Sequence, residues 1–461
     1  MISNAAHETI ANGKVALSFC RKSGSLVRIG DMETGMEYLA EPSGARLFRL
    51  MESLGIGNLQ FTEFSGEVIH EFAQLPQLAD EFVKAGIQHI CLWHRAGGLY
   101  QMNGATKEIM DEPETVLQEL EKALADVKES GINMSIILNL RLLKVIFDPY
   151  REIGESEAIR SKDGSPASRE AYPGSPYHLN NLGPSYNLGD SVTLCQRPES
   201  PFAERARTLV EKMLNLGFTS IFIDQPLNSQ CCFAPQHAHS APDLAHHDCV
   251  RWMGDVSRLV KARSEEGYVI GELPELFQTQ KIDLWWYWQW KYLSPEVYRY
   301  SHPDSLQLWV VDGDVGELNR AFAMGFYANL TPAGMERGMS GRPAVAAQAA
   351  ALAKLREATA AWTVETRFVD REGLECESAP GIVAYAFAGH GRAAVIMAET
   401  AGVAGEARLT FEPARHGTTA NEAGVLLRQT GVEEPTTPPE NGRHTLKIEL
   451  APFDVAVWRF A

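Results

Sequence analysis

The chain has 461 residues, of which 45% are hydrophobic and 22% are charged. This is the balance of a globular protein, and the length predicts about two to three domains. The formal net charge of −17 and the lack of a lysine or arginine cluster argue against nucleic acid as a partner. No segment approaches the roughly 20 unbroken apolar residues of a membrane helix, so a membrane partner is not expected.

The N-terminus and the cysteines both indicate a cytoplasmic protein. The first four residues begin no basic stretch with an apolar core behind it, so no signal peptide is predicted. The seven cysteines are an odd number spread over a long chain, which argues against a disulfide framework and fits a reducing compartment. The oligomeric state is left open.

Residues 1–59 are expected to form a short N-terminal β segment. Alternating apolar residues at 15–19 and 26–29 flank a glycine-containing turn at 23–25, which is typical of a β-hairpin. The segment is too short for an independent domain, so we expect it to pack on the domain that follows.

The pattern then changes to apolar strands that alternate with amphipathic helices, which predicts a parallel sheet covered on both faces. Three of these helices end at Gly86, Gly131 and Gly217, and glycine takes the left-handed cap conformation at the least cost. The helix and strand pairs are 75–85 with 87–93, 113–129 with 132–138, 200–216 with 218–224, and 246–264 with 267–272.

Further candidate strands at 283–289, 305–311 and 321–329, and a weaker one at 66–72, bring the number to eight. The count and the length predict an α/β fold, a (β/α)8 TIM-type barrel over residues 60–362. A doubly wound open sheet is the main alternative, but no Gly-x-Gly-x-x-Gly follows a strand, so we expect no dinucleotide and no other cofactor.

Residues 363–461 have no helical period and are expected to form a C-terminal antiparallel β-sandwich. The candidate strands, joined by turns with glycine or proline, are 381–387, 393–397, 407–411, 444–448 and 454–458.

Active-site residues of such barrels lie where the strands end on the carboxyl face. Asp224, followed by Gln225, ends one predicted strand, Glu272 ends the next with Glu275 close behind, and Asp312 ends a later one. Carboxyl groups at the edge of an apolar core have pKa values that are pushed apart, as a general acid and a nucleophile require. Two such groups are the minimal apparatus of glycoside hydrolysis. The simpler alternative is that these residues only cap the following helices.

An aromatic cluster at 285–290 favours a carbohydrate ligand. If this run is a strand, Trp286 and Trp288 share one face with Trp290, while Trp285 faces the other way. Sugar rings pack on indole, although about half of these rings are expected to serve only packing. Trp93 and His94, at the end of another strand, are expected to line the same pocket.

The loop that follows Asp224 is rich in cysteine and histidine, from Cys231 to His239. Its spacing is irregular and lacks the paired ligands of a structural zinc site, so we expect no metal. We expect His237 and His239 to donate hydrogen bonds to a substrate instead. The long connection 144–199 is expected to form a lid or a binding wall.

The runs 194–198 and 217–225, with Cys232-Phe233 and His237-Ala238-His239, resemble a bacterial glycoside-hydrolase-related family of largely unassigned function. Its barrel is similar to those of endo-α-N-acetylgalactosaminidases and, more distantly, of the α-amylase clan. The resemblance covers residues 60–335, and the C-terminal sandwich is similar to that of α-amylase-like enzymes. It implies a nucleophile at Asp224, an acid/base at Glu272 and a third carboxylate at Asp312.

The sequence departs from the α-amylase pattern at two places. Phe222 stands two residues before Asp224, where that pattern has arginine, and Val311 precedes Asp312, where the pattern has histidine. Glu275 also competes with Glu272 for the acid role.

Taken together, the sequence predicts a glycosidase that cleaves an α-linked sugar by a retaining double displacement through Asp224 and Glu272. The alternatives are a metal-dependent isomerase or lyase with His237, His239 and Asp224 as ligands, and a non-catalytic carbohydrate-binding barrel. The predicted substrate-binding residues are Trp93, His94, Gln225, His237, His239, Glu275, Trp286, Trp288 and Asp312.

Overall fold

In the computed structural model of the chain, the described residues are 2–3, 7–12, 14–20, 26–32, 53–61, 69–93, 113–140, 142–144, 150–165, 191–224, 232–237, 244–264, 266–272, 282–287, 294–303, 305–330, 338–418 and 423–460.

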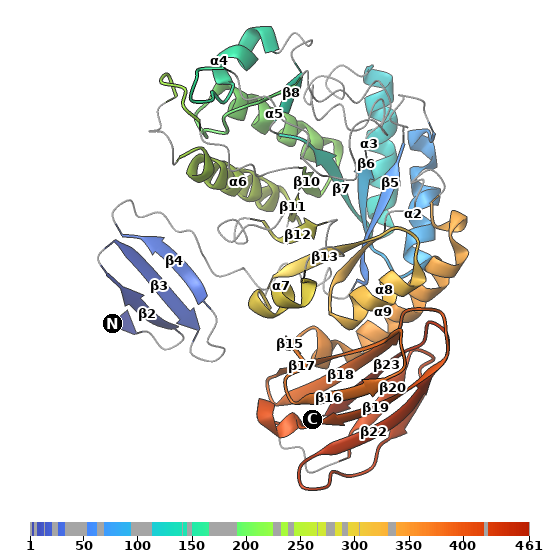
Figure 1. Cartoon of the computed structure of the whole chain (residues 1–461). Coiled ribbons are helices and arrows are strands. Elements are labelled where there is room, and N and C mark those ends of the chain that lie inside the picture. The colour runs from blue at the N-terminus through green and yellow to red at the C-terminus, as the bar shows by residue number, and fades with distance from the viewer. Residues whose placement is uncertain are drawn as a thin grey trace.

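Eight parallel strands close into a barrel, which confirms the predicted (β/α)8 fold (Figure 1). Each strand pairs with the next along the chain, and the last pairs back with the first, with Ala328 opposite Gly55. In barrel order the strands are β5 (Gly55–Gln60), β6 (His89–Trp93), β7 (Asn133–Leu138), β10 (Ser220–Ile223), β11 (Val269–Glu272), β12 (Leu284–Tyr287), β13 (Leu306–Val311) and β14 (Tyr327–Leu330).

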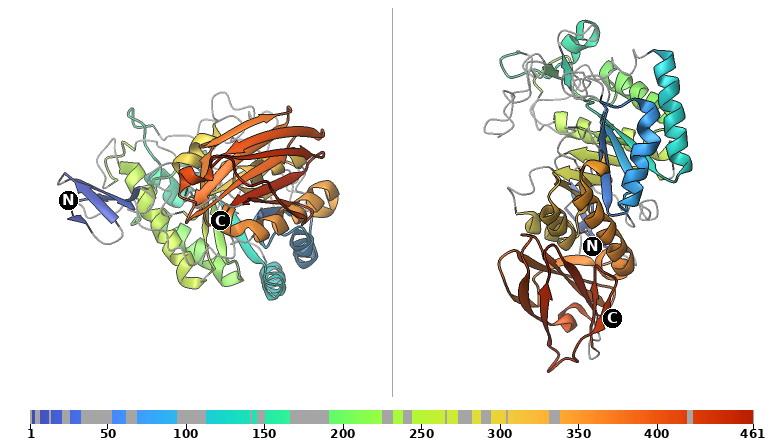
Figure 2. Two further views of the ribbon diagram at one scale, coloured as in Figure 1. Left: turned by 90° about the horizontal axis from the view of Figure 1, so that it is seen from below. Right: turned by 90° about the vertical axis from the view of Figure 1, so that its right-hand side faces the viewer.

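Helices surround the barrel (Figures 1 and 2). The helix over 201–216 shows why they form where the sequence predicts them: the Ser200 hydroxyl accepts the Ala203 N–H at 3.0 Å at its start, and Gly217 ends it with φ of 114°. The helices are α2 (Leu75–Lys84), α3 (Glu114–Glu129), α5 (Pro201–Leu216), α6 (Leu244–Arg263), α7 (Pro295–Ser301), α8 (Val315–Ala323) and α9 (Pro343–Thr363). None of the described helices is long and apolar enough to cross a membrane.

The first barrel strand differs from the prediction. The expected strand at 66–72 is wrong, because Phe72 begins the 3-10 helix η1 (Phe72–Gln74) and the first strand is β5, so the barrel starts before residue 60. Two glycines hide the strand signal of β5. A Cβ on Gly57 would lie 2.1 Å from the Phe82 ring of α2, and one on Gly55 would lie 1.8 Å from the Ala328 carbonyl oxygen.

The expected strand at 321–329 is also partly wrong. Its first residues belong to α8, and β14 begins only at Tyr327. The long connection after β7 holds some regular structure of its own: β8 (Leu142–Lys144) pairs with β9 (Ser191–Thr193), and a π-helical turn η3 (Tyr150–Gly154) leads into α4 (Glu155–Glu157).

The barrel interior is filled by alternate strand residues. Inward-facing side chains form one apolar cluster, and the residues next to them in sequence pack outward against the helices. The predicted division of the aromatic run is confirmed for its described part, since Trp286 lies in the interior cluster and Trp285 in the outer one. The interior cluster contains Ile56, Cys91, Ile137, Phe222, Tyr268, Ile270, Leu284, Trp286, Leu308 and Tyr327.

The C-terminal region is an antiparallel β-sandwich, as predicted (Figure 2). One sheet has the order β15-β17-β18-β23-β20-β21 and the other β16-β19-β22. The strands are β15 (Arg367–Asp370), β16 (Leu374–Ser378), β17 (Ile382–Gly389), β18 (Arg392–Glu399), β19 (Gly405–Phe411), β20 (Val425–Arg428), β21 (Glu433–Pro435), β22 (His444–Leu450) and β23 (Val455–Phe460).

The N-terminal region contains a four-stranded antiparallel sheet, which stands to the side of the barrel in Figure 1. Its strands are β1 (Ile2–Ser3), β2 (His7–Ala11), β3 (Val15–Cys20) and β4 (Leu26–Asp31). That this sheet packs on the barrel remains a prediction.

A buried polar network joins the sandwich to the barrel. The amide of Asn319 on α8 donates to the carbonyl oxygens of Glu399 and Phe453, each at 2.9 Å. The Glu399 carboxylate, which is fully buried, accepts backbone N–H groups from Ala401 at 2.6 Å and from Gly402 and Phe453 at 2.8 Å. Glu399 therefore fixes the end of β18 against a second sandwich loop.

We expect Glu399→Gln to lower the free energy of unfolding by about 1–3 kcal/mol, because an amide would set an N–H group against backbone N–H donors. Chemical denaturation measures the loss. Glu377→Gln, at an exposed position on β16, is the control and should stay within about 0.5 kcal/mol of the unmodified protein. Equal stability of the two variants would contradict this role for Glu399.

The effect should depend on pH. Burial raises the pKa of Glu399, but the N–H donors of Phe453, Ala401, Val403 and Gly402 outweigh it and the net pKa is lowered. A lowered pKa contributes stability that is complete above the unfolded-state value of about 4.3 and is lost as the pH falls through the folded-state value. The stability difference between the unmodified protein and Glu399→Gln should therefore shrink below about pH 4.

Candidate active site

Asp224 and Glu272 lie side by side at the carboxyl edge of the barrel. Ile223 of β10 is opposite Gly271 of β11, so the residues that follow occupy the same level of two neighbouring parallel strands. Such strands are about 4.8 Å apart. Phe222 lies in the barrel interior, as does Ile270, so the carboxylates two residues further on turn the same way. Each is only 5% exposed.

Asn139 joins this pair from the strand on the other side of β10. The backbone N–H of Asp224 donates to the Leu138 carbonyl oxygen at 2.9 Å, and the Asn139 amide donates to Asp224 Oδ2 at 3.2 Å. Asn139 is fully buried. Asn139 was not among the predicted site residues, although a polar residue directly after the apolar strand 133–138 is a usable signal.

Three aromatic rings form the floor beneath the carboxylates. The ring centroid of Trp286 lies 5.3 Å from that of Phe222 and 6.4 Å from that of Trp93, with the rings edge to face. Trp286 is also opposite Glu272 in the strand register. Phe222 thus fills with an apolar ring the position where the α-amylase pattern has arginine.

Two further asparagines anchor this floor. The Trp93 indole N–H donates to Asn58 Oδ1 at 2.9 Å, and the Asn58 amide donates to Asn329 Oδ1 at 2.7 Å. Both asparagines are buried on barrel strands, and neither was predicted from the sequence. The indole N–H of Trp286 is buried and has no hydrogen-bond partner among the described residues.

The other predicted site residues are placed differently. Asp312 follows β13 and is exposed. Asp314, two residues later, caps α8 by accepting the Gly316 N–H at 2.7 Å. Five predicted residues lie outside the described part of the chain: His94, Gln225, His239, Glu275 and Trp288.

His237 does not join the carboxylates. Its Nδ1 lies 3.2 Å from the Cys232 sulfur and its Nε2 lies 2.8 Å from the Ser156 carbonyl oxygen, and the residue is 2% exposed. With both ring nitrogens engaged, it is not positioned to donate to a substrate. The arrangement also does not support a metal-dependent isomerase or lyase in which His237 and Asp224 share one ion.

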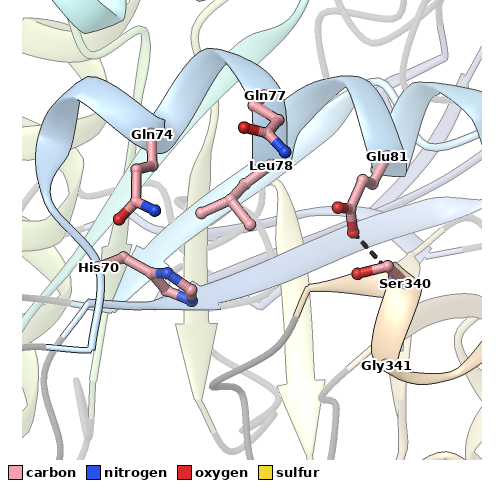
Figure 3. A pocket seen from close by; sticks show the side chains of 7 residues that line it. All are labelled: His70, Gln74, Gln77, Leu78, Glu81, Ser340 and Gly341. Carbon is pink, nitrogen blue, oxygen red and sulfur yellow. Dashed lines mark hydrogen bonds between the residues drawn. The ribbon is translucent and has the colours of Figure 1, made fainter.

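A separate groove of about 480 Å³ lies outside the barrel, between α2 and the turn before α9 (Figure 3). Glu81 crosses it, and its carboxylate accepts the Ser340 N–H at 2.8 Å. The groove holds no pair of carboxylates. Its lining residues are His70, Gln74, Gln77, Leu78, Glu81, Ser340 and Gly341.

Two carboxyl groups buried on neighbouring strands repel each other when both are ionised, and keeping one of them protonated beside an ionised one also costs folding free energy. We expect neutralising either central carboxylate to remove this cost and to stabilise the protein. Asp224→Asn and Glu272→Gln should each raise the melting temperature by about 2–4 °C, equivalent to about 1 kcal/mol. Differential scanning calorimetry measures the change. Glu399→Gln is the comparison variant, because it also neutralises a buried carboxylate but should lower the melting temperature. A fall in melting temperature for both variants would show that repulsion is not what these groups experience.

No protein-family model matches the sequence, and no curated protein matches it. Solved structures share the fold. A trehalose-6-phosphate hydrolase from Bacillus licheniformis is 9% identical with a TM-score of 0.57, and the match covers 89% of this chain and 99% of that one. An α-amylase from Geobacillus thermoleovorans is 10% identical, with a TM-score of 0.57 and 89% and 98% covered. A Nostoc punctiforme debranching enzyme is 12% identical, with a TM-score of 0.54 and 89% and 98% covered. The chain therefore has the barrel-and-sandwich fold of α-amylase-family structures.

Proposed function

We propose that the protein is a glycoside hydrolase that cleaves an α-linked sugar by a retaining double displacement. The observation that supports this most directly is the strand register that sets Asp224 beside Glu272 at the carboxyl edge of the barrel. Retaining enzymes have carboxyl groups about 5–5.5 Å apart, whereas inverting enzymes have them about 6.5–9.5 Å apart. Residues at the same level of adjacent strands favour the shorter separation.

In the first step, a carboxylate oxygen of Asp224 attacks the anomeric carbon while the carboxylic acid of Glu272 gives its proton to the departing glycosidic oxygen. The glycosidic bond breaks as the ester to Asp224 forms. In the second step, Glu272 takes a proton from water, the water oxygen attacks the same carbon, and the Asp224 carboxylate leaves. Two inversions restore the original configuration.

The surroundings of the two groups suit these roles. Asn139 donates an N–H to Asp224, and a donated hydrogen bond favours the ionised form that a nucleophile needs. Glu272 lies beside the indole of Trp286 in the register, and an apolar neighbour favours the protonated form that a general acid needs.

A sugar is the substrate class that best matches the aromatic floor. The indole rings of Trp93 and Trp286 lie below the carboxylates, and sugar C–H groups pack on aromatic surface. The exposed Asp312 can accept hydrogen bonds from sugar hydroxyl groups. The fold shared with an α-amylase and a trehalose-6-phosphate hydrolase supports an α-linkage. Roles for His94, Gln225, His239, Glu275 and Trp288 in substrate binding stay predictions, as do a kinship with endo-α-N-acetylgalactosaminidases and a cytoplasmic location.

The experiment that tests this function is a screen of aryl α- and β-glycosides, with the first-formed anomer of the product followed by NMR. Hydrolysis of an α-glycoside to an α-product supports the proposal. Hydrolysis with inversion would contradict the double displacement. Saturable sugar binding without turnover would favour the non-catalytic alternative.

For a substrate found in this screen, Asp224→Asn should lower turnover by at least about 10³-fold, because the amide cannot form the glycosyl ester. A mechanism-based fluorinated glycoside should label Asp224 in the unmodified protein, seen by peptide mass spectrometry, and leave Asp224→Asn unlabelled. Asp80→Asn, on the outer face of α2, is the matched control and should keep full activity. Undiminished turnover in Asp224→Asn would end the proposal.

A further inference from the structure

Three buried side chains with soft or nitrogen donor atoms meet in a cluster that does not include the two carboxylates. They are Cys195, just after β9, and Cys232 and His237 in the segment that follows β10. The two sulfur atoms and a ring nitrogen all lie within 4.8 Å of one another. Their exposed fractions are 0%, 1% and 2%. Tetrahedral zinc, with Zn–S of about 2.3 Å and Zn–N of about 2.0–2.1 Å, sets its ligand atoms about 3.5–3.8 Å apart.

We propose that Cys195, Cys232 and His237 supply three of the four ligands of a tetrahedral site for one divalent ion of the zinc class, which ties segment 232–237 to the end of β9. Thiolate and imidazole donors together select such ions over magnesium or calcium. The site goes beyond the proposed sugar hydrolysis and plays no chemical part in it.

The orientation of His237 matches that of a metal ligand. The Ser156 carbonyl oxygen can only accept a hydrogen bond, so the ring nitrogen Nε2, 2.8 Å away, carries the proton. The lone pair of the neutral ring is then on Nδ1, which is the atom that faces the Cys232 sulfur at 3.2 Å. Metal-binding histidines usually donate their other N–H in this way to a carbonyl or carboxylate oxygen, which fixes the ring.

The electrostatics of the cluster also favour a cation. The two cysteine side chains are packed beside the apolar side chains of Ile159 and Ala234. Two thiolates with a divalent ion make a neutral unit, which is the form that burial penalises least.

The backbone around the cluster is already arranged to hold such a site. The Cys195 N–H donates to the Glu157 carbonyl oxygen at 2.8 Å, and the Phe233 N–H donates to that of Arg160 at 2.9 Å. The Glu157 carboxylate pairs with Arg197 at 2.6 Å. These bonds bring three chain segments to one point, and the ion would lock the segment that follows the nucleophile strand.

Metal analysis of the purified full-length protein tests the proposal without any sugar. After exchange into metal-free buffer, we expect about one zinc per chain by mass spectrometry, in line with the tight binding of structural sites. Replacement by cobalt should give the visible absorption of a tetrahedral site and a sulfur-to-cobalt charge-transfer band. No zinc or cobalt uptake by the folded protein would overturn the site, and so would a Cys195–Cys232 disulfide in peptide maps.

Variants separate ligands from packing residues. Cys232→Ser and His237→Ala should lower metal occupancy by more than about tenfold, whereas His237→Cys should keep the ion because it supplies another thiolate. Cys249→Ser is the control, since Cys249 is equally buried, on α6, but lies outside the cluster. Full occupancy in His237→Ala, or an equal loss in Cys249→Ser, would contradict the assignment. Should Cys232→Ser not fold, the cobalt spectrum of the unmodified protein still decides.

Discussion

The register of neighbouring parallel strands is the constraint on which the candidate site depends. Side chains at the same level of two parallel strands point the same way, and the pairing of Ile223 with Gly271 therefore sets Asp224 beside Glu272. A slip of one residue would turn one carboxylate out of the interior into the helix layer. Phe222 and Trp286 hold the register by filling the barrel beneath. The spacing of the two acids is thus a property of barrel packing rather than of loops.

Buried polar side chains hold this barrel at points far from the site. The Arg356 guanidinium on α9 donates to the Leu54 carbonyl oxygen at 3.2 Å and to that of Phe326 at 2.8 Å, and it lies 4.6 Å from the Tyr327 ring centroid. It therefore satisfies backbone groups just before β5 and β14, where the barrel closes. Glu399 has the same role where the sandwich meets α8. Burying Arg356 or Glu399 without hydrogen-bond partners would cost folding free energy. Each side chain therefore favours the one arrangement of neighbouring backbone groups that satisfies it.

The sequence predicted what local patterns encode. Helix ends, apolar strands and the carboxylates after them follow from periodicity and capping, and Asp224 and Glu272 lie at strand ends as expected. The first strand was missed because its two glycines, Gly55 and Gly57, weaken the strand pattern. Both positions must be glycine because a Cβ there would clash with Ala328 or Phe82, and these contacts cannot be read from the local sequence. Asn58 and Asn329 were missed because a single asparagine inside an apolar strand has no periodic signal, whereas Asn139 follows a strand as the two carboxylates do. Their roles come from neighbours on other strands.

The loop rich in cysteine and histidine is visible in the sequence, but its irregular spacing predicted no metal, because Cys195 comes from a different segment than Cys232 and His237. Its position suggests why an ion belongs there. Segment 232–237 is the next described stretch after Asp224. Among the described residues, the apolar cluster that holds it consists of Ile159, Cys195, Cys232 and Ala234. So small a core contributes little against the entropy of ordering a loop. Metal coordination by three side chains would supply the folding free energy that this small core lacks. It would do so in the segment that follows β10, the strand that positions the proposed nucleophile Asp224.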